Sequence, residues 1–149
     1  MKAIHRNEAL ILGYGLFRNH TEEPWFRCGD INQAMTNDEN HPYKPIPPGS
    51  FTLVRNRLRD ASMIETWRGD SNGPGAPSEH RFVKVTDLGE ELLIGGVMYM
   101  VRHKGLTVPA ILEIPEAINA FLAYTEFETR IVQDIIGVGG LAISTSIEL

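Results

Sequence analysis

The apolar residues of this chain fall into short stretches that Gly- and Pro-rich segments separate. The stretch 81–105 reads RFVKVTDLGEELLIGGVMYMVRHKG, in which strand-forming residues precede and flank the pair Gly95-Gly96. Residues 97–101 (VMYMV) are apolar at both alternating sets of positions, which is typical of a strand covered on both sides. We therefore predict that this stretch lies in the middle of a β-sheet.

Other stretches with the same character predict further strands. Two glycines interrupt the first of them, Gly13 and Gly15, and suggest a bulge or a close neighbouring backbone. The predicted strands are residues 8–17, 51–58, 62–68 and 106–114, with a shorter candidate at 25–28. We expect 51–58 and 62–68 to pair as a hairpin.

One principal helix is predicted near the C-terminus. Pro115 fits the first helical position, and apolar residues then recur at steps of three and four from Ala117 to Ile135. The second half, residues 129–138, is rich in β-branched residues and also fits a strand. Residues 141–149 (LAISTSIEL) alternate cleanly and predict a terminal strand.

Two polar segments predict long loops, at 36–49 and 69–78. The first contains four prolines and the second reads GDSNGPGAPS. Runs of consecutive strands with a single helix favour antiparallel pairing. The sequence therefore predicts a mainly β or α+β fold, an antiparallel barrel or sandwich, in one domain over 1–149.

Length and charge narrow the classes of function. A chain of 149 residues fits a single domain, and its formal charge of −5 makes nucleic acid an unlikely partner. The single cysteine, Cys28, excludes an internal disulfide framework. No signal peptide and no membrane-spanning run is evident, so we expect a protein of the cytoplasm or of a virion, not one secreted by a signal peptide.

No catalytic motif stands out, and we predict no cofactor, metal site or catalytic residue. The five histidines lack the spacing of a zinc site. Cys28 would be a nucleophile only if a histidine such as His20 or His41 folded over it, and free cysteine is usually a small buried hydrophobe. An alternative that remains is a small hydrolase with a His/acid site in the loops 18–49 and 69–80.

Two features are candidates for contact with a partner. If the strand from Phe51 continues, Arg55, Arg57 and Arg59 share one face, roughly 6.6 Å apart, and could meet phosphates, acids of a neighbouring subunit or internal carboxylates. The terminal strand 141–149 would pair with another chain through the anchors Ile143 and Ile147, or else complete its own sheet.

The segment from Asp87 to Val101 resembles a sequence pattern of small β-rich proteins of tailed phages. An acidic turn, Asp87 to Glu91, precedes GGVMYMV at 95–101, similar to a G-x-x-Y-x-V strand of neck, head-closure and tail proteins. The resemblance implies a β-rich subunit of a symmetric assembly, without catalytic residues. We therefore expect a structural protein that binds copies of itself and other structural subunits of a homo-oligomer or virion.

Overall fold

The computed structural model describes residues 3–36, 44–69 and 81–125. Within these ranges the chain is mainly helical, with one two-stranded antiparallel sheet, so the predicted β-barrel or sandwich is wrong. In chain order the elements are α1 (Arg6–Asn19), α2 (Cys28–Thr36), α3 (Pro48–Asp60), β1 (Ile64–Trp67), β2 (Phe82–Val85), α4 (Asp87–Lys104), α5 (Val108–Ile111) and α6 (Pro115–Thr125).

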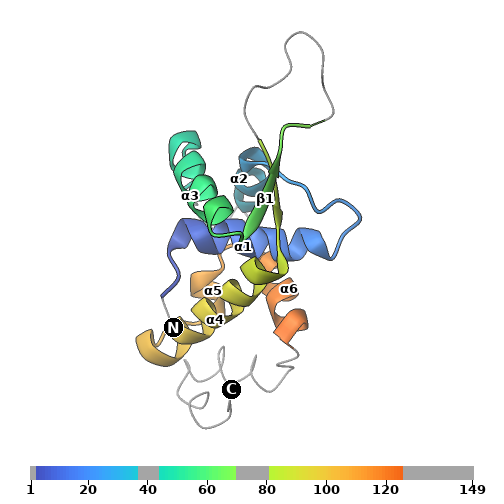
Figure 1. Ribbon diagram of the computed structural model, residues 1–149. Coiled ribbons are helices and arrows are strands. Elements are labelled where there is room, and N and C mark those ends of the chain that lie inside the picture. The colour runs from blue at the N-terminus through green and yellow to red at the C-terminus, as the bar shows by residue number, and fades with distance from the viewer. Residues whose placement is uncertain (1–2, 37–43, 70–80, 126–149) are drawn as a thin grey trace.

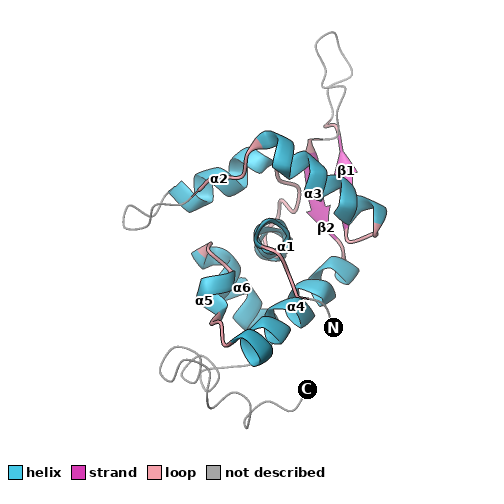
Figure 2. Cartoon of the chain, turned by 90° about the vertical axis from the view of Figure 1, so that its left-hand side faces the viewer, coloured by secondary structure: helices cyan, strands magenta, loops and turns pink. Residues whose placement is uncertain are grey.

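The elements form two groups on opposite sides of α1. Figures 1 and 2 show α2, α3 and the hairpin on one side of this helix and α4, α5 and α6 on the other. Every residue of α1 from Ala9 to Leu16 is buried. A helix that is apolar all round is one that other elements enclose. The predicted strand at 8–17 is therefore wrong. The error arose because an apolar run fits a buried strand as well as a buried helix.

The hairpin pairs strands that are separated along the chain. Ile64 faces Val85 and Trp67 faces Phe82 in the antiparallel register. The predicted strand at 62–68 is thus confirmed, but its partner is β2 and not the segment 51–58. A third short stretch joins the sheet at Phe26, whose N–H and carbonyl both bond Val83, at 3.0 and 2.8 Å. This bridge fastens the α1–α2 connection to the hairpin.

The segment 51–58, predicted as a strand, belongs to helix α3. Pro48 occupies its first turn, where the missing N–H has no cost. Phe51, Val54 and Leu58 then recur at steps of three and four and are buried. This face packs against the rest of the domain, and the opposite face is exposed to solvent.

Helix α4 replaces the predicted strands around Gly95-Gly96. Its N-cap is Thr86, whose side-chain oxygen accepts the Gly89 N–H at 3.2 Å and donates its own proton to the Ser62 carbonyl at 2.8 Å. The helix ends at Gly105, which adopts the left-handed conformation at φ 65°. The cap therefore fixes the start of α4 to the end of the α3–β1 turn.

The C-terminal half of the described chain closes the core. The helix predicted from Pro115 does begin there, as α6, and is described as far as Thr125. The predicted extended segment 106–114 contains instead the short helix α5. The remainder of the predicted helix and the terminal strand 141–149 fall beyond the described residues. None of the described helices is both long and apolar enough to cross a membrane.

Candidate functional site

The three arginines predicted to form a row lie on different sides of α3. Successive helical residues are rotated by about 100°, so alternate positions do not share a face. Arg55 is buried, with 7% of its surface exposed, and contacts the side chain of Asn56. Arg57 and Arg59 are exposed, and Arg59 lies 3.6 Å from Asp60. The row geometry is therefore wrong; partner contact by these residues remains a prediction, as it does for Ile143 and Ile147, which the structure does not describe.

The histidine and acid site of the alternative hydrolase receives no support from the described residues. His20 is the exposed C-cap of α1, while His41 and His80 lie outside the described ranges. No group of three His, Cys, Asp or Glu side chains in the described ranges is arranged to hold a metal ion. Residues 37–43 of the predicted loop 36–49 and residues 70–78 of the predicted loop 69–78 also fall outside those ranges. The first loop was predicted too long, because Pro48 and Gly49 already belong to α3.

Cys28 is not an activated nucleophile. Burial raises the pKa of its thiol above the ordinary value, and the contact with the Asn32 amide offsets this only in part. The Asn32 amide nitrogen lies 3.6 Å from the sulfur, and the thiol points to the Ile46 carbonyl at 3.7 Å. The thiolate is the reactive form, so a raised pKa keeps this cysteine unreactive at neutral pH.

We expect iodoacetamide to label Cys28 more slowly at pH 7 than it labels N-acetylcysteine under the same conditions. The rate should rise with pH through a midpoint above that of the free thiol, because the thiolate is the reacting species. Mass spectrometry of quenched samples measures both. Labelling of the native protein as fast as the free thiol would contradict the burial of this side chain.

The exposed face of α3 is the most distinctive surface of the described chain. Leu53 lies near its centre with 73% of its surface exposed, more than the other large exposed hydrophobic residues of the described ranges. Helical spacing places five other residues within about 60° of Leu53. We call this set the α3 face: Gly49, Ser50, Leu53, Asn56, Arg57 and Asp60.

Basic residues concentrate on α3 and the hairpin. The described residues 44–69 and 81–85 contain seven Lys and Arg but two Asp and Glu. The other described residues, 3–36 and 86–125, contain five Lys and Arg but nine Asp and Glu. The total charge of −5 conceals this asymmetry, which counting charges segment by segment along the sequence would have revealed.

Aromatic side chains hold the hairpin against the α1–α2 connection. Trp25 packs against Trp67 with ring centroids 5.6 Å apart and planes tilted by 56°, and Trp67 contacts Phe82 at 5.5 Å. The Arg27 guanidinium lies over the Phe82 ring at 5.6 Å. These contacts lie on the outer face of the sheet, at the end where Trp67 pairs with Phe82, and they tie that end of the hairpin to the α1–α2 connection.

Comparison with protein-family models, with curated proteins and with solved structures found no match for this chain.

Proposed function

We propose that this chain is a double-stranded DNA-binding protein of the winged helix-turn-helix type, in which α3 enters the major groove and the hairpin contacts the adjacent backbone. The observation that carries the proposal is the exposed α3 face beside a hairpin in the basic part of the chain. Its class of function is sequence-specific binding, as in a regulator of transcription.

The order of the elements supports this class. Three helices precede an antiparallel hairpin, and a short stretch between the first two helices pairs with it through Phe26. In helix-turn-helix proteins the second helix of the motif reads base edges from the major groove. Here that helix is α3, which lies in the same layer as the hairpin (Figure 2). In the sequence, residues 37–47 separate it from α2, which is more than the usual three or four residues.

The side chains of the α3 face have the chemistry that base edges require. An exposed leucine such as Leu53 can contact the methyl group of thymine. The amide oxygen of Asn56 accepts hydrogen bonds from Arg55, and its NH2 group can donate to an acceptor on a base edge. Arg57 on the same face is exposed and suits a phosphate oxygen, as does the exposed Arg59 on another side of the last turn of α3. The α3 face therefore combines one apolar and several polar contacts at helical spacing.

The total charge of −5 led to the expectation that nucleic acid is an unlikely partner, and that expectation has not been tested. Phosphate binding depends on the local field of the docking surface, and the described residues 44–69 and 81–85, which include α3 and both strands of the hairpin, carry a net charge of +5. The acidic residues gather in the other described segments. Such an arrangement favours one orientation of the protein on a duplex.

A selection of bound duplexes from a random-sequence library, followed by fluorescence anisotropy at several salt concentrations, tests the proposal. We expect a preferred sequence and an affinity that falls steeply with salt. Arg59→Gln should reduce the magnitude of the log–log salt slope by about 0.9, because one phosphate contact is lost. Lys104→Gln is the matched control, since this exposed residue ends α4 on the other side of α1.

Two outcomes would contradict the proposal. The first is the absence of any preferred sequence together with no binding at low salt. The second is an equal change of slope for Arg59→Gln and Lys104→Gln, which would mean that α3 contributes nothing specific. The role as a structural subunit of a virion remains a separate prediction, which measurement of the mass in solution tests. The expected β-rich fold no longer supports it, because the described chain is mainly helical.

A further inference from the structure

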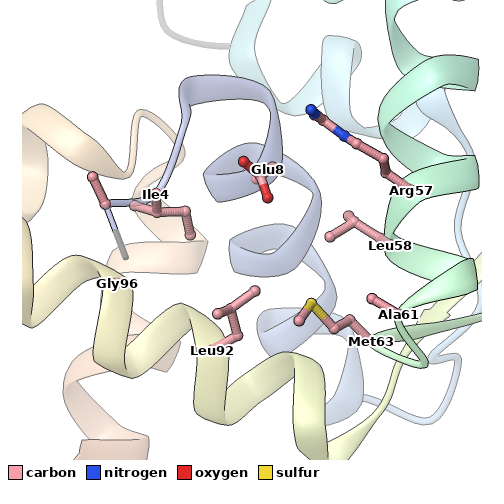
Figure 3. A pocket seen from close by; sticks show the side chains of 9 residues that line it. Ile4, Glu8, Arg57, Leu58, Ala61, Met63, Leu92 and Gly96 are labelled. Atoms are coloured by element: carbon pink, nitrogen blue, oxygen red, sulfur yellow. The ribbon is translucent and has the colours of Figure 1, made fainter. Parts of the chain in front are cut away.

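A small apolar cavity opens between the two sides of the domain. It has a volume of about 240 Å³ and lies between the start of α1, the end of α3 and the middle of α4 (Figure 3). Ile4, Leu58, Met63 and Leu92 supply its apolar walls. The volume is just below the range of about 300–1,000 Å³ that is typical of sites for drug-sized ligands, so it suits a smaller molecule.

Two opposite charges stand at the rim of this cavity. Glu8 comes from α1 and Arg57 from α3, and Figure 3 shows their side chains on the same side of the cavity, extending from facing walls. Neither side chain makes a hydrogen bond or an ion pair with another described residue. Each therefore keeps its hydrogen-bonding capacity available to a molecule that enters the cavity.

The geometry points to a binding site for a small zwitterion with an apolar side chain, namely a free apolar amino acid. Its carboxylate would accept hydrogen bonds from the Arg57 guanidinium, and its ammonium group would donate to the Glu8 carboxylate. Its side chain would fill the space between Ile4, Leu58 and Leu92. A pair of opposite charges above an apolar cavity is complementary to this class of molecule.

Other occupants match the cavity less completely. A plain hydrocarbon would cover Glu8 and Arg57 without pairing them, which costs free energy because charged groups lose water. A simple carboxylate or amine would satisfy one of the two charges and leave the other. The amino acid is the smallest common metabolite class that satisfies both charges and the apolar walls.

The amino-acid site is separate from the proposed DNA-binding function, although the two surfaces share one residue. Arg57 belongs to both the cavity rim and the α3 face, so an occupant of the cavity would engage a side chain of the surface that we assign to DNA. Binding of the amino acid is measured without nucleic acid, and its outcome therefore does not depend on whether the chain binds DNA.

Isothermal titration calorimetry with L-leucine, L-methionine and L-phenylalanine tests the site on the full chain. We expect saturable binding of at least one of them. Two analogues of leucine separate the contribution of the Arg57 contact from that of the Glu8 contact. Isoamylamine lacks the carboxylate, and 4-methylvalerate lacks the ammonium group. Each should bind about tenfold more weakly than leucine, or worse, because one charge-assisted hydrogen-bonded contact is lost. Glycine, which lacks the apolar side chain, should not bind measurably.

Substitutions at the rim locate the binding in this cavity. Arg57→Gln and Glu8→Gln should each weaken leucine binding about tenfold or more, whereas Arg59→Gln, one helical position outside the cavity, should not change it. Ala61→Leu should abolish binding, because Ala61 points into the cavity from an exposed position that tolerates a larger side chain (Figure 3). Ala61→Ser is its matched control.

The proposal is overturned if none of the three amino acids binds at millimolar concentration. It is overturned equally if 4-methylvalerate or isoamylamine binds as tightly as leucine, since the paired charges would then do nothing. Unchanged leucine binding by Arg57→Gln and Ala61→Leu, both with wild-type circular dichroism, would place the binding elsewhere and also refute this site.

Discussion

Replacement of Gly89 by alanine should lower the free energy of unfolding by about 3 kcal/mol, and hence the Tm by about 10 °C for a domain of this size. A Cβ on Gly89 would overlap the backbone carbonyl of Met63. That carbonyl is held in place, because it also accepts the N–H of Thr86 at 3.1 Å. The start of α4 would therefore have to move away from the hairpin. Thermal unfolding followed by far-UV circular dichroism measures the loss.

The same substitution at Gly29 is the matched control and should have the opposite sign. Gly29 lies in α2, where an added Cβ meets nothing within 4 Å. Alanine there removes conformational freedom from the unfolded chain and should stabilise the protein by about 0.4–1 kcal/mol. If Gly89→Ala left the Tm unchanged while Gly29→Ala raised it, the close approach of α4 to Met63 would be contradicted.

The glycines explain much of what the sequence pattern predicted wrongly. Gly13 and Gly15 suggested a bulge or a close neighbouring backbone, and Gly95-Gly96 was read as a pair flanked by strands. A helix was not expected at either place, because a glycine inside a helix costs about 1 kcal/mol relative to alanine. In the structure Gly15 faces Val85, and Gly96 faces Ile4, whose Cβ would lie 2.9 Å from an added Cβ. Each glycine lets two segments pack closely. That gain depends on contacts between distant residues, which a local pattern does not reveal.

The segment of α3 carried two patterns at once. Arginines at 55, 57 and 59 alternate as in a strand, whereas Phe51, Val54 and Leu58 recur as in a helix. The helix buries all three apolar residues against the domain, and this burial favours the helix over a strand. The strand at 62–68 and the strand-forming residues at the start of 81–105, which contain β2, were predictable because their β-branched and aromatic residues fit a half-buried sheet. Their pairing was not, since a long loop separates them.

The candidate site was only partly accessible from the sequence. The arginines at 55, 57 and 59 were predicted to contact a partner, which stays a prediction, and their division between one buried and two exposed positions depends on the helix. The exposure of Leu53 was missed for the same reason, because a strand would have placed it on the same face as Phe51, which is buried. The cavity between α1, α3 and α4 joins residues as far apart as Ile4 and Gly96, so no local motif marks it.

The second large effect that we expect is on DNA binding. Leu53→Glu should weaken binding of the selected duplex about a hundredfold, because it removes an apolar base contact and places a negative charge against the phosphates. The side chain is 73% exposed and supports no core, so the free energy of unfolding should change by no more than about 0.5 kcal/mol. Fluorescence anisotropy and thermal unfolding measure the two quantities separately.

The control for this substitution makes the same chemical change on another helix. Leu88 is 48% exposed in the first turn of α4, and Leu88→Glu alters the net charge by the same amount. It should leave duplex binding within about twofold of the wild type, since a single charge remote from the DNA is largely screened at physiological salt. Equal losses for the two variants would mean that total charge alone governs binding. A Leu53→Glu protein that binds as tightly as the wild type would place the DNA contact on a surface other than α3.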